Sequence, residues 1–272
     1  MNILFPRLNN GYIPLLLCFI AFLAGISGSL QAPFYPKEAK AKGLNKIHVG
    51  LVFGTYHLII FMTSPFFGKK VKHIGTKKMI YIGVIIMGSA GICFGLLEFI
   101  QNKTLFIILS YVIRGIEALG HSSFKTATFT IVANEYPDTV GSLFSFLQAS
   151  FGAGLTLGPF FGGVLYNMGG FCLPFIFIGA MKVIVSLIVY LILPSYKGEA
   201  PSNQNNVSSP HGLRDLFYVP EIPLQVISTL GATICIGFLQ ATLRYHIDQF
   251  HLSETSYGKS KLAHIKYVAT FM

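Results

Sequence analysis

The stretch that decides the fold is GAGLTLGPFFGGVLY, residues 152–166. It is almost wholly apolar, yet it contains five glycines and one proline. In water both residue types weaken a helix, and an internal proline costs roughly 3 kcal/mol. In lipid the backbone groups must bond within their own segment, so even a glycine-rich segment stays helical. Small residues then become useful, because they let two helix backbones approach each other closely.

The glycines of this stretch form one face of the expected helix. Gly154, Gly158 and Gly162 recur at every fourth residue, and Gly163 widens the same face. Pro159 removes one backbone hydrogen bond and favours a bend. The pattern therefore predicts a kinked helix that packs closely on another helix. Small residues at this spacing also occur in helices that only dimerise, and this alternative stays open.

The composition is that of a membrane protein. Of the 272 residues 53% are hydrophobic and only 11% are charged, whereas soluble domains carry about 25% charged residues. The formal net charge of +10 arises mostly from bases in short gaps between apolar runs, where lipid headgroups and membrane orientation account for them. The sequence lacks the basic and aromatic arrays of nucleic-acid-binding proteins, so we expect a lipid bilayer and no nucleic acid as partner.

Motifs of enzymes are absent from the sequence. It contains no glycine-rich phosphate loop, nucleophile elbow or cluster of metal ligands. The four cysteines lie in four different apolar runs, with no partner at the spacing of a metal site. We therefore predict that the protein is not an enzyme and that it needs no metal or cofactor.

Seven apolar runs are long enough to cross a bilayer, which takes about 20 residues. They cover residues 12–34, 47–67, 79–100, 105–133, 140–166, 171–193 and 223–243. The fold class expected is an all-α membrane protein. A polar segment rich in Ser, Asn and Pro separates the first six spans from the seventh. The expected units are a six-helix half at 1–193, a cytoplasmic linker at 194–220, the start of a second half at 221–258 and an atypical basic tail at 259–272.

The orientation follows from the lysines and arginines of the short loops, which are enriched on the cytoplasmic side. The N-terminus, the loop between spans 2 and 3 and the central linker together carry more of them than the opposite loops. This excess predicts a cytoplasmic N-terminus. Lys37, Lys40, Lys42 and Lys46, just before span 2, oppose that orientation.

Five polar residues lie on one stripe of the fourth span. Arg114, Glu117, His121, Lys125 and Thr128 fall within about 80° of one another around a helix. A charge at membrane depth costs at least about 2.5–3.5 kcal/mol and marks function by default. We interpret the stripe as the wall of a cavity in which Arg114 fixes a charge, Glu117 titrates and His121 relays protons. The structural alternative is an Arg–Glu pair that holds spans together.

Two further ionisable residues lie near the centres of spans. His57 in span 2 joins the proposed proton path, with a hydrogen-bonded packing histidine as the alternative. Lys182 in span 6 needs a partner or a path to water, and no pattern in the sequence identifies either. Span 1 offers hydroxyl and amide groups but no carboxylate at mid-depth, so positive charge prevails and an organic anion remains an alternative solute.

Several motifs resemble those of the major facilitator superfamily. GLTLGPFFGG at 154–163 resembles its antiporter signature in span 5, and the matching residues are Gly154, Gly158, Pro159, Gly162 and Gly163. GKKVKHIGTKK at 68–78 is similar to its loop between spans 2 and 3, with matches at Gly68, Gly75, Lys77 and Lys78. RGIEALGHSS at 114–123 resembles its span 4 motif. Two positions depart from the pattern, with Lys72 in place of an acid and Ser145 in place of a glycine.

Within the superfamily the chain resembles the vesicular amine transporter group, and its polyamine-transporting branch in particular. The segments that carry this likeness are APFYPKEAKAKG at 32–43 and HVGLVFGTYHL at 48–58. The resemblance implies a helical bundle of two six-span halves, proton-coupled antiport of a small organic amine and a vesicular or other internal membrane. With seven spans we expect a partial chain, such as a fragment, a splice form or a faulty gene model.

Two other functions were weighed against transport. A seven-span receptor fits the number of spans, but its Asp-Arg-Tyr and Asn-Pro-x-x-Tyr motifs and its outer cysteine pair are missing. A non-transporting regulatory half would instead pair with a full-length carrier or a second half through the face from Gly154 to Gly162.

Overall fold

The computed structural model describes residues 11–193 and the single positions 227, 231 and 235. The predicted linker at 194–220 and the tail at 259–272 lie outside the described residues. The seventh span and the start of a second half do so too, apart from those three positions.

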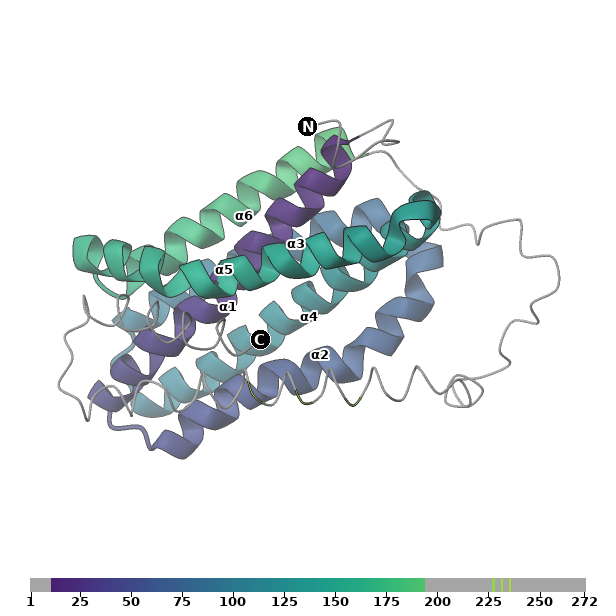
Figure 1. The fold of residues 1–272 in the computed structure, drawn as a ribbon. Coiled ribbons are helices and arrows are strands. Elements are labelled where there is room, and N and C mark those ends of the chain that lie inside the picture. The colour runs from purple at the N-terminus through teal and green to yellow at the C-terminus, as the bar shows by residue number, and fades with distance from the viewer. Residues whose placement is uncertain (1–10, 194–226, 228–230, 232–234, 236–272) are drawn as a thin grey trace.

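The described chain is a bundle of six long helices, as the apolar runs predict (Figure 1). The helices are α1 Tyr12–Ala41, α2 Lys46–Ile74, α3 Thr76–Gly95, α4 Lys103–Glu135, α5 Val140–Gly169 and α6 Cys172–Ile192. Two short 3-10 helices, η1 Leu96–Phe99 and η2 Pro137–Thr139, follow α3 and precede α5. All six long helices have the length and hydropathy to cross a bilayer. In this comparison α3 is counted together with η1, and α5 together with η2.

The loop predicted at 68–78 is wrong for most of its length. Helix α2 continues through Gly68 to Ile74, and Lys77 and Lys78 already belong to the first turn of α3. Only Gly75 breaks the helix, with a φ of 86° that L side chains rarely adopt. The lysines between these glycines are good helix formers, so the two helices extend beyond the apolar core to one sharp turn.

Helix α1 also extends past its predicted end. It runs through Pro33 and Pro36 to Ala41, whereas the apolar run ends at residue 34. Both prolines are buried against neighbouring helices, which makes the loss of their backbone hydrogen bonds tolerable. The extension carries Lys37 and Lys42 to contacts with other helices.

The bundle is held by a few close helix pairs. Helix α1 packs most extensively on α5, α3 on α4 and α6, and α2 on α4, while α2 and α6 lie on opposite sides (Figure 1). Glycines lie at three of these crossings. Gly83 of α3 faces Gly120 of α4, and Gly88 of α3 faces Gly179 of α6. Close backbone approach at small residues is what drives helix association in lipid.

The glycines of the opening stretch form the crossing of α5 with α1. A Cβ on Gly154 would meet the backbone of Phe22 and Ile26, and one on Gly158 would meet Ile26 and Ser29. The predicted close packing is therefore made within the chain. Pairing with a full-length carrier through these same glycines would require α1 and α5 to separate.

Gly163 does not belong to this crossing, contrary to the sequence-based expectation. A Cβ built on Gly163 would meet nothing within 4 Å, whereas one on its neighbour Gly162 would meet Leu30 and Phe34. The helix turns by about 100° per residue, so Gly163 leaves the contact that Gly162 makes.

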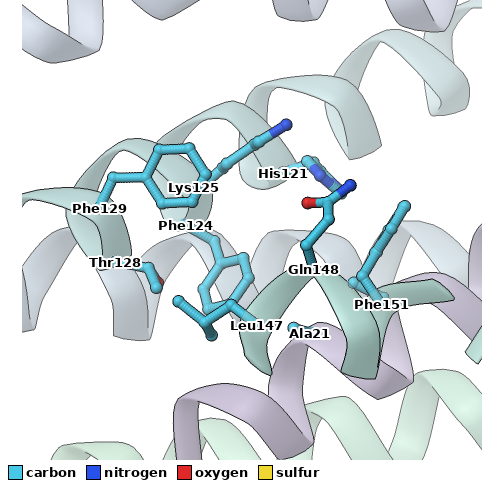
Figure 2. Close-up of a pocket in the computed structure, with 10 residues that line it drawn as sticks. Ala21, His121, Phe124, Lys125, Thr128, Phe129, Leu147, Gln148 and Phe151 are labelled. Atoms are coloured by element: carbon cyan, nitrogen blue, oxygen red, sulfur yellow. The ribbon is translucent and has the colours of Figure 1, made fainter. Parts of the chain in front are cut away.

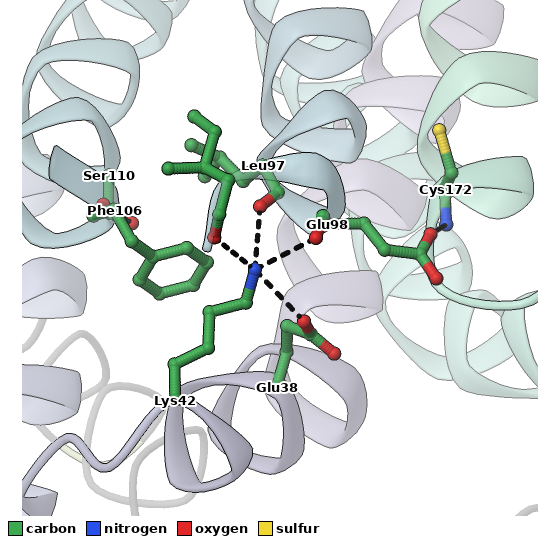
Figure 3. Close-up of polar contacts among 8 residues, drawn as sticks. Glu38, Lys42, Leu97, Glu98, Phe106, Ser110 and Cys172 are labelled. Atoms are coloured by element: carbon green, nitrogen blue, oxygen red, sulfur yellow. Dashed lines mark hydrogen bonds and ion pairs between the residues drawn. The ribbon is translucent and has the colours of Figure 1, made fainter. Parts of the chain in front are cut away.

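A lysine joins neighbouring helices at the end of the bundle where α1 ends (Figure 3). The ammonium group of Lys42 donates to the carbonyl oxygens of Leu97, Glu98 and Ile100 at 3.1, 2.8 and 2.6 Å. It also lies 3.3 Å from a carboxylate oxygen of Glu38 and 4.8 Å from the ring centre of Phe106. The last carbonyls of a helix lack their usual partners. Lys42 supplies a donor here, in addition to the backbone N–H of Ile100, which donates to the Leu97 oxygen at 3.1 Å.

Glu98 extends the same joint to α6. Its carboxylate accepts a hydrogen bond of 2.9 Å from the backbone N–H of Cys172, the first residue of α6. A negative charge at this position also complements the helix dipole. One end of the bundle is thus fastened by Lys42 and Glu98 across α1, η1 and α6.

Candidate functional site

Glu117 lies at the centre of a buried polar network. It is 2% exposed, and Arg114 donates to its Oε2 at 2.7 Å. Ser27 of α1 donates to Oε1 and the Gln31 amide donates to Oε2, both at 3.1 Å. The predicted pairing of Arg114 with Glu117 three residues later is therefore present. Three donors and one opposite charge offset the cost of burying the carboxylate.

Arg114 is enclosed by aromatic rings from α2. It is 1% exposed, and its guanidinium carbon lies 4.0 Å from the ring centre of Tyr56 and 5.7 Å from that of Phe53. Such stacking stabilises a desolvated guanidinium. Its Nε and the Gln31 Oε1 are buried and have no partner among the described residues. The network therefore has spare donor and acceptor capacity.

His121 has its partner on a neighbouring helix. Its spacing on α4 would allow a pair with Glu117, but its Nδ1 forms a hydrogen bond of 3.0 Å with the Tyr56 hydroxyl. Tyr56 projects from α2, which packs on α4. The tyrosine therefore bridges Arg114, through its ring, and His121, through its hydroxyl.

The other predicted residues lie at the edges of this network. His57 is half-buried and its Nδ1 bonds to the backbone oxygen of Phe53 at 3.2 Å, the geometry of the packing alternative. Lys182 is 1% exposed on α6 and interacts electrostatically with Glu117 and Arg114. Within the described part of the chain it forms neither a hydrogen bond nor an ion pair. It is thus a third charge beside the buried pair.

Lys125 departs from the rest of the stripe, because it is exposed and opens onto a pocket (Figure 2). The pocket lies between α1, α4 and α5 and is open on one side, with roughly 410 Å³ of empty space that includes the solvent at its mouth. Its lining residues are Ala21, Ala24, His121, Phe124, Lys125, Thr128, Phe129, Leu147, Gln148 and Phe151. Arg114 and Glu117 do not reach it. The stripe is therefore divided into a sealed ion pair and an open part.

The sequence motif residues lie away from this site. Gly68 and Lys78 are exposed near the turn at Gly75, and the Lys77 ammonium lies 5.5 Å from the ring centre of Tyr190 on α6. Gly154 and Gly158 are buried on the face of α5 toward α1, and Pro159 is buried beside them. These residues shape the bundle, whereas the ionisable side chains of α4 form the candidate site.

Several site residues escaped the sequence analysis. Ser27 and Gln31 were noted only as polar residues of the first span, and Tyr56 and Gln148 were not considered. Ser27 and Gln31 are separated along the sequence by 86 residues or more from their partner on α4, and Tyr56 is separated by 65 residues from His121. No local spacing could therefore indicate these contacts. The one available signal was that Ser27 and Gln31 lie four residues apart on one face of an apolar helix.

A unit of six apolar helices with ionisable groups in its interior defines a class of protein, the polytopic membrane proteins, in which such groups mark functional sites by default. The sequence comparison gives the family. The model of the Major Facilitator Superfamily matches residues 17–270. The chain therefore belongs to the Major Facilitator Superfamily, whose matched relatives are transporters and not enzymes.

The relatives agree with the resemblance to vesicular amine transporters. The MFS-type transporter SLC18B1 of Rattus norvegicus is 33% identical over 226 residues, which cover 83% of this chain and 48% of the relative. The vesicular acetylcholine transporter of Rattus norvegicus is 23% identical, over 81% of this chain and 39% of the relative. The synaptic vesicular amine transporter of Homo sapiens is 23% identical, over 78% of this chain and 44% of the relative. The chain spans about half the length of these curated relatives, or less.

Proposed function

We propose that the chain forms one half of a proton-coupled carrier of a small organic solute, with amines as the first candidate class. Two relatives whose names state a solute, acetylcholine and amines, support this class. The carriers of this superfamily bind their solute between two six-helix halves. The described bundle would supply one of these halves, and a second half would supply the opposite wall.

The observation that carries the proposal is the buried ion pair of Glu117 with Arg114. A carboxylate inside a membrane bundle is costly, and this one is tied to both α1 and α4 by hydrogen bonds. Protonation of Glu117 would break its ion pair with Arg114 and loosen the contact between these helices. A proton could in this way bias the movement of the half, with His121 and Tyr56 as the nearest relay.

The membrane and the orientation are part of the same proposal. The names of the relatives support a vesicular membrane, and the lysines near Gly75 support a cytoplasmic N-terminus. With six spans the N-terminus and residue 193 lie on one side, and the Lys42 joint lies on the other. Protons and solute would then be exchanged between the cytoplasm and the vesicle interior.

A second candidate solute class is organic anions. Arg114, Lys125 and Lys182 outnumber Glu117 among the interior charges, and Glu117 is already engaged by Arg114. A cationic solute would need either the release of Glu117 or a carboxylate from outside the described residues. An anion would meet Lys125 without such a change.

The experiment is uptake into vesicles that contain the chain together with the part of the rat MFS-type transporter SLC18B1 that it does not cover. A pH gradient with an acidic interior should drive accumulation of a labelled aliphatic diamine. Glu117→Gln keeps the size of the side chain and one acceptor oxygen but cannot ionise. It should abolish the dependence on pH while leaving exchange without a gradient. Full pH-driven uptake by this variant would refute the role of Glu117.

A further inference from the structure

Exposed basic side chains gather at the turn between α2 and α3. They are Lys69, Lys70, Lys72 and His73 in the last two turns of α2 and Lys78 in the first turn of α3, and we call them the basic patch. We propose that the basic patch binds the phosphorylated headgroup of an anionic membrane lipid, of the kind that a phosphatidylinositol bisphosphate carries. This proposal concerns the lipid partner of the bundle and does not depend on solute transport.

The basic patch is built on helical backbone, which fixes its distance from the membrane core. The apolar run of α2 ends at residue 67, but the helix continues to Ile74. The added length is about 10 Å. The headgroup layer is about 5–8 Å deep on each side of the hydrocarbon core. The extension of α2 therefore carries the lysines through this layer, at the depth where lipid phosphates lie.

One face of α2 continues from apolar side chains into the basic patch. Met62 and Phe66 are 68% and 53% exposed, and Lys69 and His73 follow them within about 60° around the helix. Val71 lies on the opposite side and is buried in the core of the bundle. A lipid can therefore place its acyl chains along Met62 and Phe66 while its headgroup contacts the lysines. A soluble anion would use only the second of these two surfaces.

The positive charge of the basic patch is not neutralised by protein carboxylates. Residues 68–78 contain no acid, and Lys72 occupies the position at which the superfamily loop has one. Two acids lie at the same end of the bundle, Glu135 at the end of α4 and Asp138 in η2. Neither forms an ion pair with the basic patch within residues 11–193. The phosphates of a lipid headgroup would supply the missing negative charge.

The density of positive charge favours a headgroup with several phosphates. The four lysines of the basic patch lie within residues 69–78, and basic clusters of this size beside a span are typical of sites for phosphorylated lipids. The Lys70 ammonium lies 4.5 Å from the ring centre of Phe66, a contact that holds it on the lipid-facing side of α2. A bisphosphate can accept charge-assisted hydrogen bonds from several lysines at once, whereas phosphatidylserine offers a single net charge.

Native mass spectrometry of the full chain in nonionic detergent tests the proposal, because it counts bound lipids. Phosphatidylinositol bisphosphate, phosphatidylinositol and phosphatidylserine are titrated in separate samples. We expect saturable binding of the bisphosphate lipid, at least about tenfold tighter than binding of the two lipids with one net charge. Equal affinity for the three lipids would overturn the proposal, since the basic patch would then be only a general positive surface.

Two matched double variants assign the binding to the basic patch. Lys69→Gln with Lys72→Gln removes two exposed lysines, keeps good helix formers and should weaken the bisphosphate lipid at least about tenfold. Lys40→Gln with Lys103→Gln removes two exposed lysines at the other end of the bundle and should leave this affinity unchanged. Equal losses in the two double variants, or no loss in the first, would contradict the proposal.

Two other occupants of this surface are distinguished in the same experiment. If soluble inositol trisphosphate binds as tightly as the bisphosphate lipid, the ligand is a soluble phosphate and the acyl chains play no part. The titration is also repeated with the part of the rat MFS-type transporter SLC18B1 that the chain does not cover, and loss of lipid binding there assigns the surface to the second half. Either result overturns the proposal. Neither involves pH-driven uptake, which tests the proposed function separately.

Discussion

At the scale of single residues, Glu117 shows why a charge can persist inside this bundle. Its carboxylate receives hydrogen bonds from Ser27, Gln31 and Arg114, all of them buried. Removal of one partner of such a pair typically costs about 3–5 kcal/mol, because the other charge is left without compensation. Arg114 has in addition the faces of Tyr56 and Phe53. The pair is therefore held by two neighbouring helices, α1 and α2, as well as by its own.

Lys42 stabilises the end of the bundle where α1 ends, and its loss should lower the stability of the fold. Lys42→Met removes hydrogen bonds to three carbonyl oxygens and the ion pair with Glu38, and we expect it to lower the free energy of unfolding by at least about 2 kcal/mol. Lys40→Met, in the same helical turn but exposed, is the control and should have little effect. Both are measured by denaturant unfolding in micelles, and equal stability of the two variants would contradict the role of Lys42.

At the scale of helices, the α1–α5 crossing depends on individual glycines and not on the motif as a whole. Gly158→Ala places a Cβ against the backbone of Ile26 and the side chain of Ser29, so α1 and α5 must move apart. Gly163→Ala, in the same motif, adds a methyl group to open space. We expect Gly158→Ala to lower the unfolding temperature markedly and Gly163→Ala to leave it unchanged, as measured by thermal unfolding in detergent. Equal effects of the two substitutions on the unfolding temperature would contradict the α1–α5 contact at Gly158.

The helices themselves were largely predictable and their partners were not. Six apolar runs became six helices because lipid forces each run to satisfy its own backbone, and the spacing of Arg114 and Glu117 fixed their contact on α4. The ends were less certain, since the extension of α1 to Ala41 and of α2 to Ile74 lies in polar segments. Ser27, Gln31 and Tyr56 meet α4 only through tertiary packing, which a single sequence does not encode in any local spacing.

At the scale of the whole molecule, the stripe on α4 has two parts with different access to water. Arg114 and Glu117 are sealed between α1, α2 and α4, and Lys125 opens onto a pocket beside α5. A second half of the superfamily fold would face this bundle and enclose the solute between the two walls. In the proposed function, the open part would bind the solute and the sealed pair would respond to the proton. This division of labour is the central claim of the proposed function.

Cysteine labelling tests that division most directly. Single cysteines at Lys125, Gln148 and Ser110 are placed in a chain whose four native cysteines are replaced, and a small water-soluble thiol reagent is applied in lipid discs. Ser110 is fully buried one turn from Arg114 and takes no part in the ion pair of Arg114 with Glu117. We expect rapid labelling at 125 and 148 and no labelling at 110. Labelling at 110 as fast as at 125, or sealed positions at both 125 and 148, would contradict the account.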